Sequence, residues 1–430
     1  MTKDTSPVVN IKTMDMLGRP EVVTVDEARG MLLSQFNPVP PPKIEMPIDD
    51  CLGRVTAIDV LSPEDLPNFS RSTVDGFAVA ASDTFGATEA IPAYLNIAAE
   101  VIMGKEPVFE LRKGEVARIA TGGMLPIGSD AVVMLEHTQA INEKIIEVLR
   151  PVAPGDNVIQ AGEDAKKGDL ILSKGHRIRP QDIGALAGLG ITSIPVYEKP
   201  RVVIISTGDE VVPASSPIKT GEVRDINSYN LAGLITKRGG VPIRKGILPD
   251  RYDVIKAVLK QSLKEADIVT ITGGSSVGAR DLTAKIINDL GSPGVLFHGV
   301  SVKPGKPMIG GIVDGKAVFG LPGHPAAVTV CFELFIRPVL ELLTGEKKKH
   351  YRHGNNTVKA RLTKNLASSS GREEHIRVAI EERDGKLWAR PILGKSGLIT
   401  TLVKADGTIV IPLRKLGLDE GEEVEVILFD

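Results

Sequence analysis

The chain has 430 residues, 25% of them charged, with a formal net charge of −2. This length exceeds that of one ordinary domain and predicts two to four compact units. A near-neutral balance argues against a nucleic-acid partner, because such a protein needs a basic face to neutralise phosphates. Only a local basic patch around a small anionic ligand is compatible with this composition.

The cysteines and histidines predict neither a disulfide framework nor a zinc site. Cys51 and Cys331 are the two cysteines, and the seven histidines show no HExxH spacing. The N-terminus lacks the pattern of a signal peptide, and no apolar run approaches the roughly 20 residues that span a bilayer. We therefore expect a cytoplasmic protein with no membrane partner.

The first half of the chain alternates between segments with the sequence pattern of a linker and segments with that of β-strands. Residues 1–20 are polar and predict a flexible N-terminus. Residues 21–50 and 151–195 predict a discontinuous mixed domain for linkage or dimerisation. It contains a helix from Val25 to Phe36 with Thr24 as N-cap, and a second helix that begins at Pro180. Residues 51–150 predict a small β-rich domain with strands near residues 55–60, 97–102, 115–119 and 131–135.

The second half begins with buried apolar strands that alternate with helices. Two such strands run from Arg201 to Ser206 and from Asp267 to Thr272, with helical patterns at residues 228–238 and 250–265. A third strand, loop and helix occupy residues 317–343. This alternation predicts a doubly wound, mostly parallel sheet in residues 196–346. Residues 347–430 read as short strands of a C-terminal β domain, so the fold class is multidomain α/β.

Ligands of open α/β sheets bind beyond the carboxyl ends of the strands. Three suggestive loops fall there, at Ser206–Glu210, Gly273–Gly278 and Gly320–Pro325, and Lys303–Pro307 adds two lysines on a stiff turn. Glycines let backbone N–H groups approach a phosphate, and hydroxyls and lysines donate further hydrogen bonds. Each loop alone is more often a tight turn than a ligand loop, but together they predict an anion site. The P-loop and dinucleotide fingerprints are absent.

Acidic residues in the same region indicate a cation or proton transfer. Glu210, Asp250 and Asp281 follow the predicted strands, and carboxylates beside a phosphate are costly unless a cation lies between them. The alternatives are structural, since Asp250 and Asp281 also suit helix N-caps and Glu210 suits the surface. Both interpretations remain open from the residues alone.

The order of these motifs resembles the molybdopterin molybdenumtransferase family, which is related to the E domain of gephyrin. The resemblance covers roughly residues 20 to 430. The matching stretches are Asn68–Val79, Arg118–Val133, Gly162–Asp164, Ser206–Glu210, Gly273–Gly278 with Asp281, Lys303–Pro307 and Gly320–Pro325.

The resemblance implies an enzyme that inserts molybdenum from molybdate, or tungsten, into adenylylated molybdopterin. AMP is released, and Mg²⁺ assists. The implied catalytic residues are Asp75, Asp164, Glu210, Asp250 and Asp281, of which Glu210 and Asp281 would bind the metal. The implied substrate-binding residues are Thr121, Ser206, Thr207, Gly208, Asp225, Asn227, Gly273, Gly274, Ser275, Ser276, Lys303, Lys306, Pro322, Pro325, Arg377 and Ser396. Among these, Arg377 and Ser396 align with the family's molybdate pocket.

The resemblance also implies a homodimer with an active site shared between subunits, so that Asp75, Thr121 and Asp164 act in trans. A molybdopterin adenylyltransferase is the implied partner, and it is also the rival identity for the chain. A non-enzymatic scaffold like gephyrin is the second rival. The chain departs from the family at His298, where several members carry lysine, and at His324, where asparagine is frequent. Both histidines could equally be structural.

Overall fold

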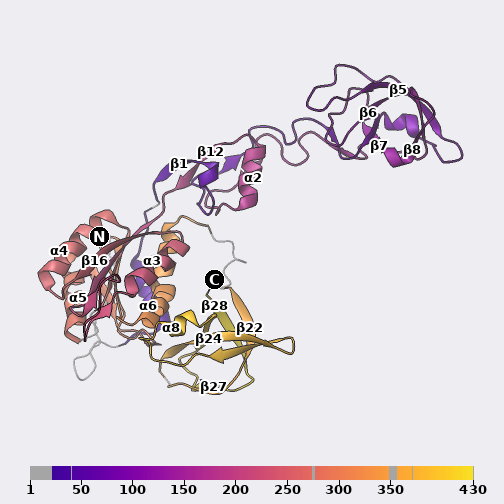
Figure 1. The fold of residues 1–430 in the computed structure, drawn as a ribbon. Coiled ribbons are helices and arrows are strands. Elements are labelled where there is room, and N and C mark those ends of the chain that lie inside the picture. Colours follow the sequence, from indigo (N-terminus) through magenta and orange to yellow (C-terminus); the bar gives the residue numbers. More distant parts are fainter. Residues whose placement is uncertain (1–21, 40, 274–276, 348–355, 370, 430) are drawn as a thin grey trace, which may run out of the picture.

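The computed structural model describes residues 22–39, 41–273, 277–347, 356–369 and 371–429, and the side chains of residues 277–281 are not among those described. The predicted flexible segment at residues 1–20 lies outside these ranges. The molecule is elongated, with a β-rich domain at one end and a narrow connection that leads to an α/β domain and a C-terminal barrel (Figure 1). No helix among the described residues is long and apolar enough to cross a membrane.

The β-rich domain is a six-stranded sheet with the order β7-β4-β6-β5-β9-β8. Its elements are β4 (Gly76–Val79), η2 (Ala81–Thr84), β5 (Ala93–Glu100), β6 (Glu115–Ile119), β7 (Ala131–Met134), η3 (Leu135–His137), β8 (Thr138–Ala140) and β9 (Ile145–Val148). The three strands predicted after residue 90 are confirmed as β5, β6 and β7. The strand predicted at residues 55–60 is wrong, because Val55 and Thr56 form only isolated bridges while packing against the linker.

The connection consists of two antiparallel passes of the chain. Its paired strands are β1 (Lys43–Pro47) with β12 (Ser193–Tyr197), β2 (Val60–Leu61) with β11 (Leu170–Leu172), and β3 (Arg71–Ser72) with β10 (Val158–Ile159). It also carries η1 (Ile48–Asp50) and α2 (Pro180–Gly188), which confirms the helix predicted at Pro180. Burial opposes ionisation of Asp182 in α2, yet hydrogen bonds from Arg179 and His176 hold the pKa of its carboxyl well below the usual value.

The α/β domain contains a six-stranded sheet in the order β16-β13-β17-β21-β20-β18. The parallel strands are β13 (Arg201–Thr207), β16 (Val241–Leu248), β17 (Ile268–Thr272) and β21 (Lys316–Leu321), and the antiparallel edge is β18 (Pro293–His298) and β20 (Ile309–Val313). A short pair, β14 (Val211–Val212) and β15 (Val223–Arg224), lies beside it. The predicted doubly wound, mostly parallel sheet is confirmed.

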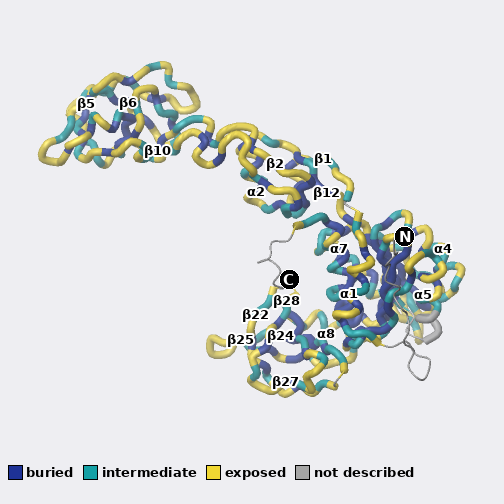
Figure 2. The backbone as a smooth tube through the Cα atoms, turned by 180° about the vertical axis from the view of Figure 1, so that it is seen from behind, coloured by how far each residue is buried: buried dark blue, intermediate teal, exposed yellow. Residues whose placement is uncertain are grey.

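Helices cover both faces of this sheet because its strands are apolar on both sides. Val202 and Ile204 of β13 pack under α3 (Asn227–Lys237) and the long segment formed by α6 (Pro325–Cys331), a π-helical turn η4 (Phe332–Ile336) and α7 (Arg337–Leu343). Val203 and Ile205 of the same strand pack under α4 (Tyr252–Glu265) and α5 (Val277–Leu290). Figure 2 shows the resulting buried interior of the domain.

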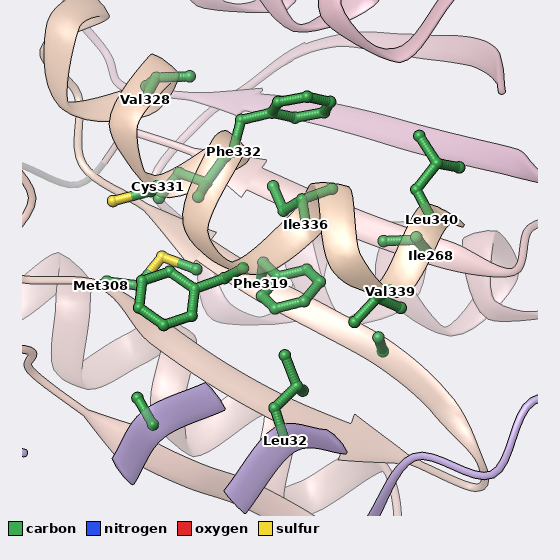
Figure 3. Close-up of a cluster of buried hydrophobic side chains, with 14 of the residues drawn as sticks. Leu32, Ile268, Met308, Phe319, Val328, Cys331, Phe332, Ile336, Val339 and Leu340 are labelled. Carbon is green, nitrogen blue, oxygen red and sulfur yellow. The ribbon is translucent and has the colours of Figure 1, made fainter. Parts of the chain in front are cut away.

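The helix α1 (Val25–Gln35) belongs to this core and not to the linker. Thr24 caps it as predicted, since the Thr24 hydroxyl accepts the Glu27 N–H and the Glu27 carboxylate accepts the Thr24 N–H. Leu32 of α1 belongs to the same cluster of buried side chains as Phe319 and Phe335, and Figure 3 shows Leu32 and Phe319 within it. The sequence grouped residues 21–50 with the linker, and in the structure the apolar face of α1 is buried on the α/β sheet.

The C-terminal domain closes into a barrel, because β24 pairs with both β25 and β26. Its elements are β22 (Thr357–Leu362), β23 (Leu366–Ala367), β24 (Glu373–Arg383), β25 (Lys386–Pro391), α8 (Thr400–Val403), β26 (Gly407–Ile411), β27 (Gly417–Leu418) and β28 (Glu423–Leu428). A strand of the preceding domain, β19 (Val302–Lys303), adds to β24 in parallel register. This pairing fixes the barrel next to the ligand-facing edge of the α/β sheet.

Candidate functional site

A cavity lies at the carboxyl ends of β17 and β21, where the sequence predicted a ligand site. It measures about 150 Å³ and is lined by Ile271, Gly273, Thr283, Pro307, Ile309, Gly320, Leu321, Pro322, Gly323 and His324. Gly273 belongs to the second predicted loop, Pro307 to the Lys-Pro-Gly-Lys-Pro turn, and the residues from Gly320 to His324 to the third loop, while the others come from β17, α5 and β20. The structure therefore brings three separate motifs to one opening, as expected for an open parallel sheet.

Gly273 is held against the first loop and must be glycine. Its φ is +129°, and an added Cβ would lie 2.1 Å from the carbonyl oxygen of Thr207. No side chain fits at that distance, and the backbone conformation itself favours glycine. The second loop therefore begins in direct contact with the first, so the chain that follows β17 starts beside the acidic residues after β13.

The acids after β13 and β16 form a cluster with unusual electrostatics. The Asp250 N–H donates to Asp209 Oδ1 at 3.4 Å, and Oδ1 of Asp250 is buried with no hydrogen-bond partner. Burial raises the pKa of the Asp250 carboxyl; a hydrogen bond from Thr207 opposes this effect, and the neighbouring Asp209 and Glu210 add to it. Helix α4 begins after Asp250 with Arg251 at the N-cap, so the N-cap interpretation of Asp250 is wrong.

Several predicted substrate-binding residues make hydrogen bonds that hold the loops in place. Ser206 and Thr207 are buried, and the Ser206 hydroxyl donates to Asp225 Oδ2 at 2.9 Å. Asp225 also accepts the N–H and hydroxyl of Ser228, which fixes the start of α3. Asn227 donates from Nδ2 to the Gly323 carbonyl at 2.8 Å, and its Oδ1 is buried without a partner. The first loop and α3 are thereby tied to the third loop.

Part of the predicted site lies outside the described residues. This applies to Gly274, Ser275 and Ser276 and to the side chain of Asp281. The backbone places Asp281 inside α5, which begins at Val277, so Asp281 is not an N-cap. Among the side chains that the structure describes, no three His, Cys, Asp or Glu groups are arranged to hold a metal ion.

Two lysines stand between the α/β domain and the barrel. Lys303 pairs with Oε1 of Glu374 at 2.5 Å, while Lys306 is exposed. Glu374 is nearly buried in β24 and also accepts the Ser368 hydroxyl at 2.8 Å. Lys303 therefore has a structural partner in the barrel, and Lys306 adds an exposed cation on the turn that leads to Pro307 at the cavity.

The barrel residues Arg377 and Ser396 differ in their relation to the cavity. Ser396 Oγ lies 2.8 Å from Nδ1 of His324, which lines the cavity, and the Ser396 carbonyl accepts the Ala326 N–H at 3.1 Å. Arg377 is buried and donates from Nη2 to the Gly394 carbonyl at 3.1 Å. Pro322 and Pro325, both buried, flank His324. His324 thus lines the cavity, although in the sequence it stood out only as a departure from the family pattern.

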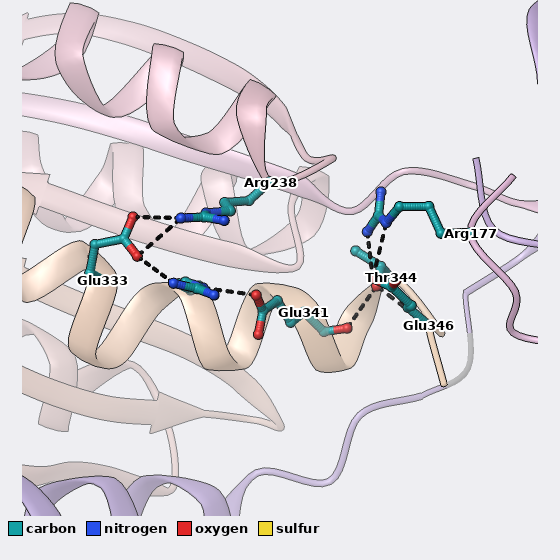
Figure 4. A network of polar contacts seen from close by, with 7 residues as sticks. Arg177, Arg238, Glu333, Glu341, Thr344 and Glu346 are labelled. Carbon is teal, nitrogen blue, oxygen red and sulfur yellow. Dashed lines mark hydrogen bonds and ion pairs between the residues drawn. The ribbon is translucent and has the colours of Figure 1, made fainter. Parts of the chain in front are cut away.

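Arg377 also lines a second and larger cavity of about 1110 Å³ between the α/β domain, the linker and the barrel. Its polar wall is an ion-pair network in which Glu333 binds Arg238 and Arg337, Arg337 also binds Glu341, and Arg177 binds Glu346 (Figure 4). These pairs join α3, α7 and the linker. The carboxylates of this wall are already neutralised by arginines, so the wall holds domains together.

The remaining predicted residues lie far from the strand-end cavity within the same chain. Asp75 Oδ1 accepts both the N–H (2.7 Å) and the hydroxyl (2.9 Å) of Thr121 in the β-rich domain. These hydrogen bonds lower the pKa of the exposed Asp75 carboxyl. Asp164 is exposed on the narrow connection. Figure 1 shows the β-rich domain at the opposite end of the molecule from the α/β sheet.

Comparison with known proteins agrees with this arrangement of domains. The models of the MoeA N-terminal region (domains I and II), a probable molybdopterin-binding domain and the MoeA C-terminal region (domain IV) match residues 23–190, 203–342 and 359–429. Together they span most of the chain. The three matches follow the connection with its β-rich domain, the α/β domain and the barrel in turn.

Curated relatives and solved structures match along nearly the whole length. The molybdopterin molybdenumtransferase of Bacillus subtilis is 34% identical over 89% of this chain and 88% of its own length. That of Haemophilus influenzae is 31% identical over 95% and 99%. The crystal structure of a molybdopterin biosynthesis MoeA protein from Pyrococcus horikosii has a TM-score of 0.81 and 40% identity, covering 95% of this chain and 100% of that chain.

The fold and the site define a multidomain α/β protein of molybdenum cofactor biosynthesis. The chain belongs to the MoeA family, whose curated members named here are molybdopterin molybdenumtransferases. The resemblance seen in the sequence is therefore confirmed at the level of the family and its transferase class.

Proposed function

We propose that this protein inserts molybdenum from molybdate into adenylylated molybdopterin and releases AMP. The observation that carries the proposal is the convergence of the second loop, the third loop and the Lys303–Pro307 turn on one strand-end cavity, with the first loop and its acids in contact with Gly273. Parallel-sheet edges of this kind bind phosphorylated ligands through backbone N–H groups, and the lysines supply charge for an incoming oxyanion. Tungstate has the same charge and tetrahedral shape, so the chemistry admits either oxyanion.

The chain's residues divide between binding and proton handling. The glycine-rich backbone after β17 binds phosphate oxygens, and Pro322 and Pro325 fix the shape of the third loop. Asp250, whose carboxyl pKa is raised by burial and by the neighbouring Asp209 and Glu210, can take part in proton transfer or orient a water molecule. Glu210 remains exposed beside it. Ser206, Thr207, Asp225 and Asn227 hold these loops in register rather than contact the substrate.

A magnesium ion fits the donor chemistry of this edge. Carboxylate oxygens are the ligands that Mg²⁺ prefers, and the buried Oδ1 of Asp250 has an unused lone pair. Glu210 and Asp281 would hold the ion, which supplies positive charge to the phosphates when bound. Asp209, which the sequence did not single out, lies within the same cluster.

A homodimer would complete the site. Asp75, Thr121 and Asp164 lie on the β-rich domain and its connection, remote from the cavity of their own chain. A second copy related by a two-fold axis can bring these residues to the cavity, so that each active site is shared between the two subunits. The upstream reaction must attach AMP to molybdopterin, so an adenylyltransferase is the partner that supplies the substrate.

The two buried free cysteines suit a reducing compartment such as the cytoplasm.

The test separates the transferase from the adenylyltransferase. Purified protein is given either ATP with molybdopterin or adenylylated molybdopterin with molybdate, and AMP, pyrophosphate and finished cofactor are measured. We expect molybdate-dependent AMP release with the second pair and no pyrophosphate with the first. Pyrophosphate release from ATP would establish the adenylyltransferase instead. The whole-length match to molybdenumtransferases, with the β-rich domain and barrel included, favours the first outcome.

A further inference from the structure

An exposed apolar patch lies on the β-rich domain, on the loops that follow β5 and β6. These loops lie side by side, because Ile127 forms a backbone bridge with Glu110 and a Cβ on Gly122 would lie 3.5 Å from Cε of Met103. We call this surface the distal patch. Its side chains are 53–99% exposed and belong to Ile102, Met103, Val108 and Ile127.

The distal patch borders the two residues that the proposed function brings to the cavity of a partner. Gly122 directly follows Thr121, whose N–H and hydroxyl donate to Asp75. The patch loops are anchored, since Leu111 and Leu125 pack into a hydrophobic cluster of the same domain. An apolar surface that is fixed in place and exposed to water is typical of a contact site for another surface.

A second exposed apolar patch lies beside the strand-end cavity. The Val223 N–H of β15 donates to the Glu210 carbonyl, so this patch adjoins the first loop. Asn227 at the start of α3 donates to the carbonyl of Gly323, which lines the cavity. We call this surface the cavity patch. Its side chains are 38–52% exposed and belong to Val223, Ile226 and Tyr229.

The rims of the two patches carry charges that attract each other. Glu106 and Glu110 are exposed beside the distal patch, and acidic residues outnumber basic ones in residues 41–170. Arg224 is exposed beside the cavity patch, and the guanidinium carbon of Arg244 lies 4.0 Å from the ring centroid of Tyr229. An apolar centre with an oppositely charged rim is the usual composition of a specific protein interface.

The two patches of one chain do not face each other, because the β-rich domain lies at the opposite end of the molecule from the α/β sheet (Figure 1). A second copy of the chain supplies the missing surface. In a pair related by a two-fold axis, the distal patch of each copy meets the cavity patch of the other, so every patch is covered. The same arrangement brings Asp75 and Thr121 to the partner's cavity.

We propose that the distal patch docks on the cavity patch of a second copy and closes the shared site over the substrate. The inference rests on the proposed function and adds the contact that holds the two subunits around the substrate. Closure of a site excludes bulk water and completes its set of catalytic groups. The docked patches therefore shield the adenylate bond from water while molybdate is bound.

Chemical cross-linking tests the contact without turnover. Val108→Cys is combined in full-length protein with a second cysteine in the cavity patch, and the native Cys51 and Cys331 are buried. The second cysteine is introduced in turn by Val223→Cys, Ile226→Cys or Tyr229→Cys. Because the patches of one chain lie far apart, a short bismaleimide can join them only between copies. We expect covalent dimers from the double variants and none from the single variants.

Ile91→Cys is the matched control for Val108→Cys. Ile91 is 73% exposed in the same domain, but it precedes β5 whereas the distal patch follows that strand. Combined with the same cavity-patch cysteines, it should give no covalent dimer. Absence of dimers from every Val108→Cys combination, or equal yields from the Ile91→Cys combinations, would overturn the inference.

Charged substitutions test the consequence for the shared site. Val108→Asp and Val223→Asp each place a carboxylate in the apolar contact, so we expect AMP release at limiting substrate to fall about 10-fold. Either change opens the contact, so the double variant should lose no more than the weaker single variant. Ile91→Asp should keep the wild-type rate, and thermal melts verify that all four proteins are folded.

A wild-type rate in Val108→Asp would overturn the inference, and so would losses that multiply in the double variant. Failure of the proposed function has a separate signature. Wild-type protein would then release no AMP from adenylylated molybdopterin with molybdate, while the cross-linking result, which needs no turnover, would still report on the contact.

Discussion

The ammonium group of Lys303 lies 2.5 Å from Oε1 of Glu374, and this ion pair joins the α/β domain to the barrel. Glu374 is 10% exposed while Lys303 is 49% exposed, so the carboxylate depends on the pair more than the amine does. The lysine that the sequence assigned to substrate binding therefore also holds the barrel in place. Its two roles can be separated by changing one partner at a time.

Lys303→Ala should lower stability as well as oxyanion affinity. It leaves a nearly buried carboxylate with only the Ser368 hydrogen bond, at a cost of about 1–2 kcal/mol after allowance for the exposed lysine. Glu374→Gln keeps the packing and frees the ammonium, so we expect molybdate affinity to be retained or raised. Urea denaturation and molybdate titration measure both effects. Normal stability in Lys303→Ala combined with weaker molybdate binding in Glu374→Gln would contradict the assignment of both a structural and an anion-binding role to Lys303.

Asp250→Asn should stabilise the protein at neutral pH while it reduces turnover. The raised pKa means that the folded state holds the Asp250 proton more tightly than the unfolded state does. Stability contributed by this group is therefore greatest at low pH and declines as the pH rises from the unfolded pKa through the folded pKa. Asparagine stays neutral, so the loss of stability with rising pH should be smaller in Asp250→Asn. Its apparent Tm at pH 7 should be about 1–3 °C higher than that of the wild-type protein. Thermal melts from pH 4 to 8 compare the two proteins, and a lower Tm across this range would refute the interpretation.

Gly273→Ala should separate the first and second loops. The added Cβ would meet the Thr207 carbonyl oxygen at 2.1 Å in a backbone conformation of positive φ, and such strain costs about 1–3 kcal/mol. We expect substrate affinity and turnover to fall together. Gly184→Ala in α2 is the matched control, because its Cβ meets nothing within 4 Å. Equal activity of the two variants would mean that the contact between the loops is not required.

Mixed dimers test whether the site is shared. Asp75→Asn and Glu210→Gln should each abolish AMP release on their own. If Asp75 acts on the cavity of the partner, a refolded equal mixture contains dimers with one intact site and recovers about a quarter of wild-type activity. Activity of the separate and mixed proteins is the measurement. No recovery, with heterodimers verified by mass spectrometry, would place both residues in one chain's site.

The sequence predicted the helices and central parallel strands because their signals are local. β13 and β17 are continuous apolar runs, and Thr24 and Pro180 mark helix starts by their chemistry. The antiparallel edge was missed. β20 contains Gly310 and Gly311, which weaken a strand pattern, yet a Cβ at Gly310 would lie 2.2 Å from the Phe297 ring. Those glycines are explained by a tertiary contact with β18, which no local pattern reveals.

The same limit applies to the site. The sequence predicted the loops and acids because they come directly after the apolar strands. They lie close together because the carboxyl ends of parallel strands meet at one edge of the sheet. The buried state of Ser206 and Thr207 and the pairing of Lys303 with Glu374 depend on contacts with distant segments. The placement of α1 on the sheet is a further example, because an amphipathic helix does not specify which surface it will cover.

The most direct test of the central claim is a crystal structure of the protein with adenylylated molybdopterin. The account predicts that the phosphates of the ligand lie at the carboxyl ends of β17 and β21, against Gly273 and Pro322. Ligand bound only in the larger cavity between the domains, with the strand ends empty, would contradict it.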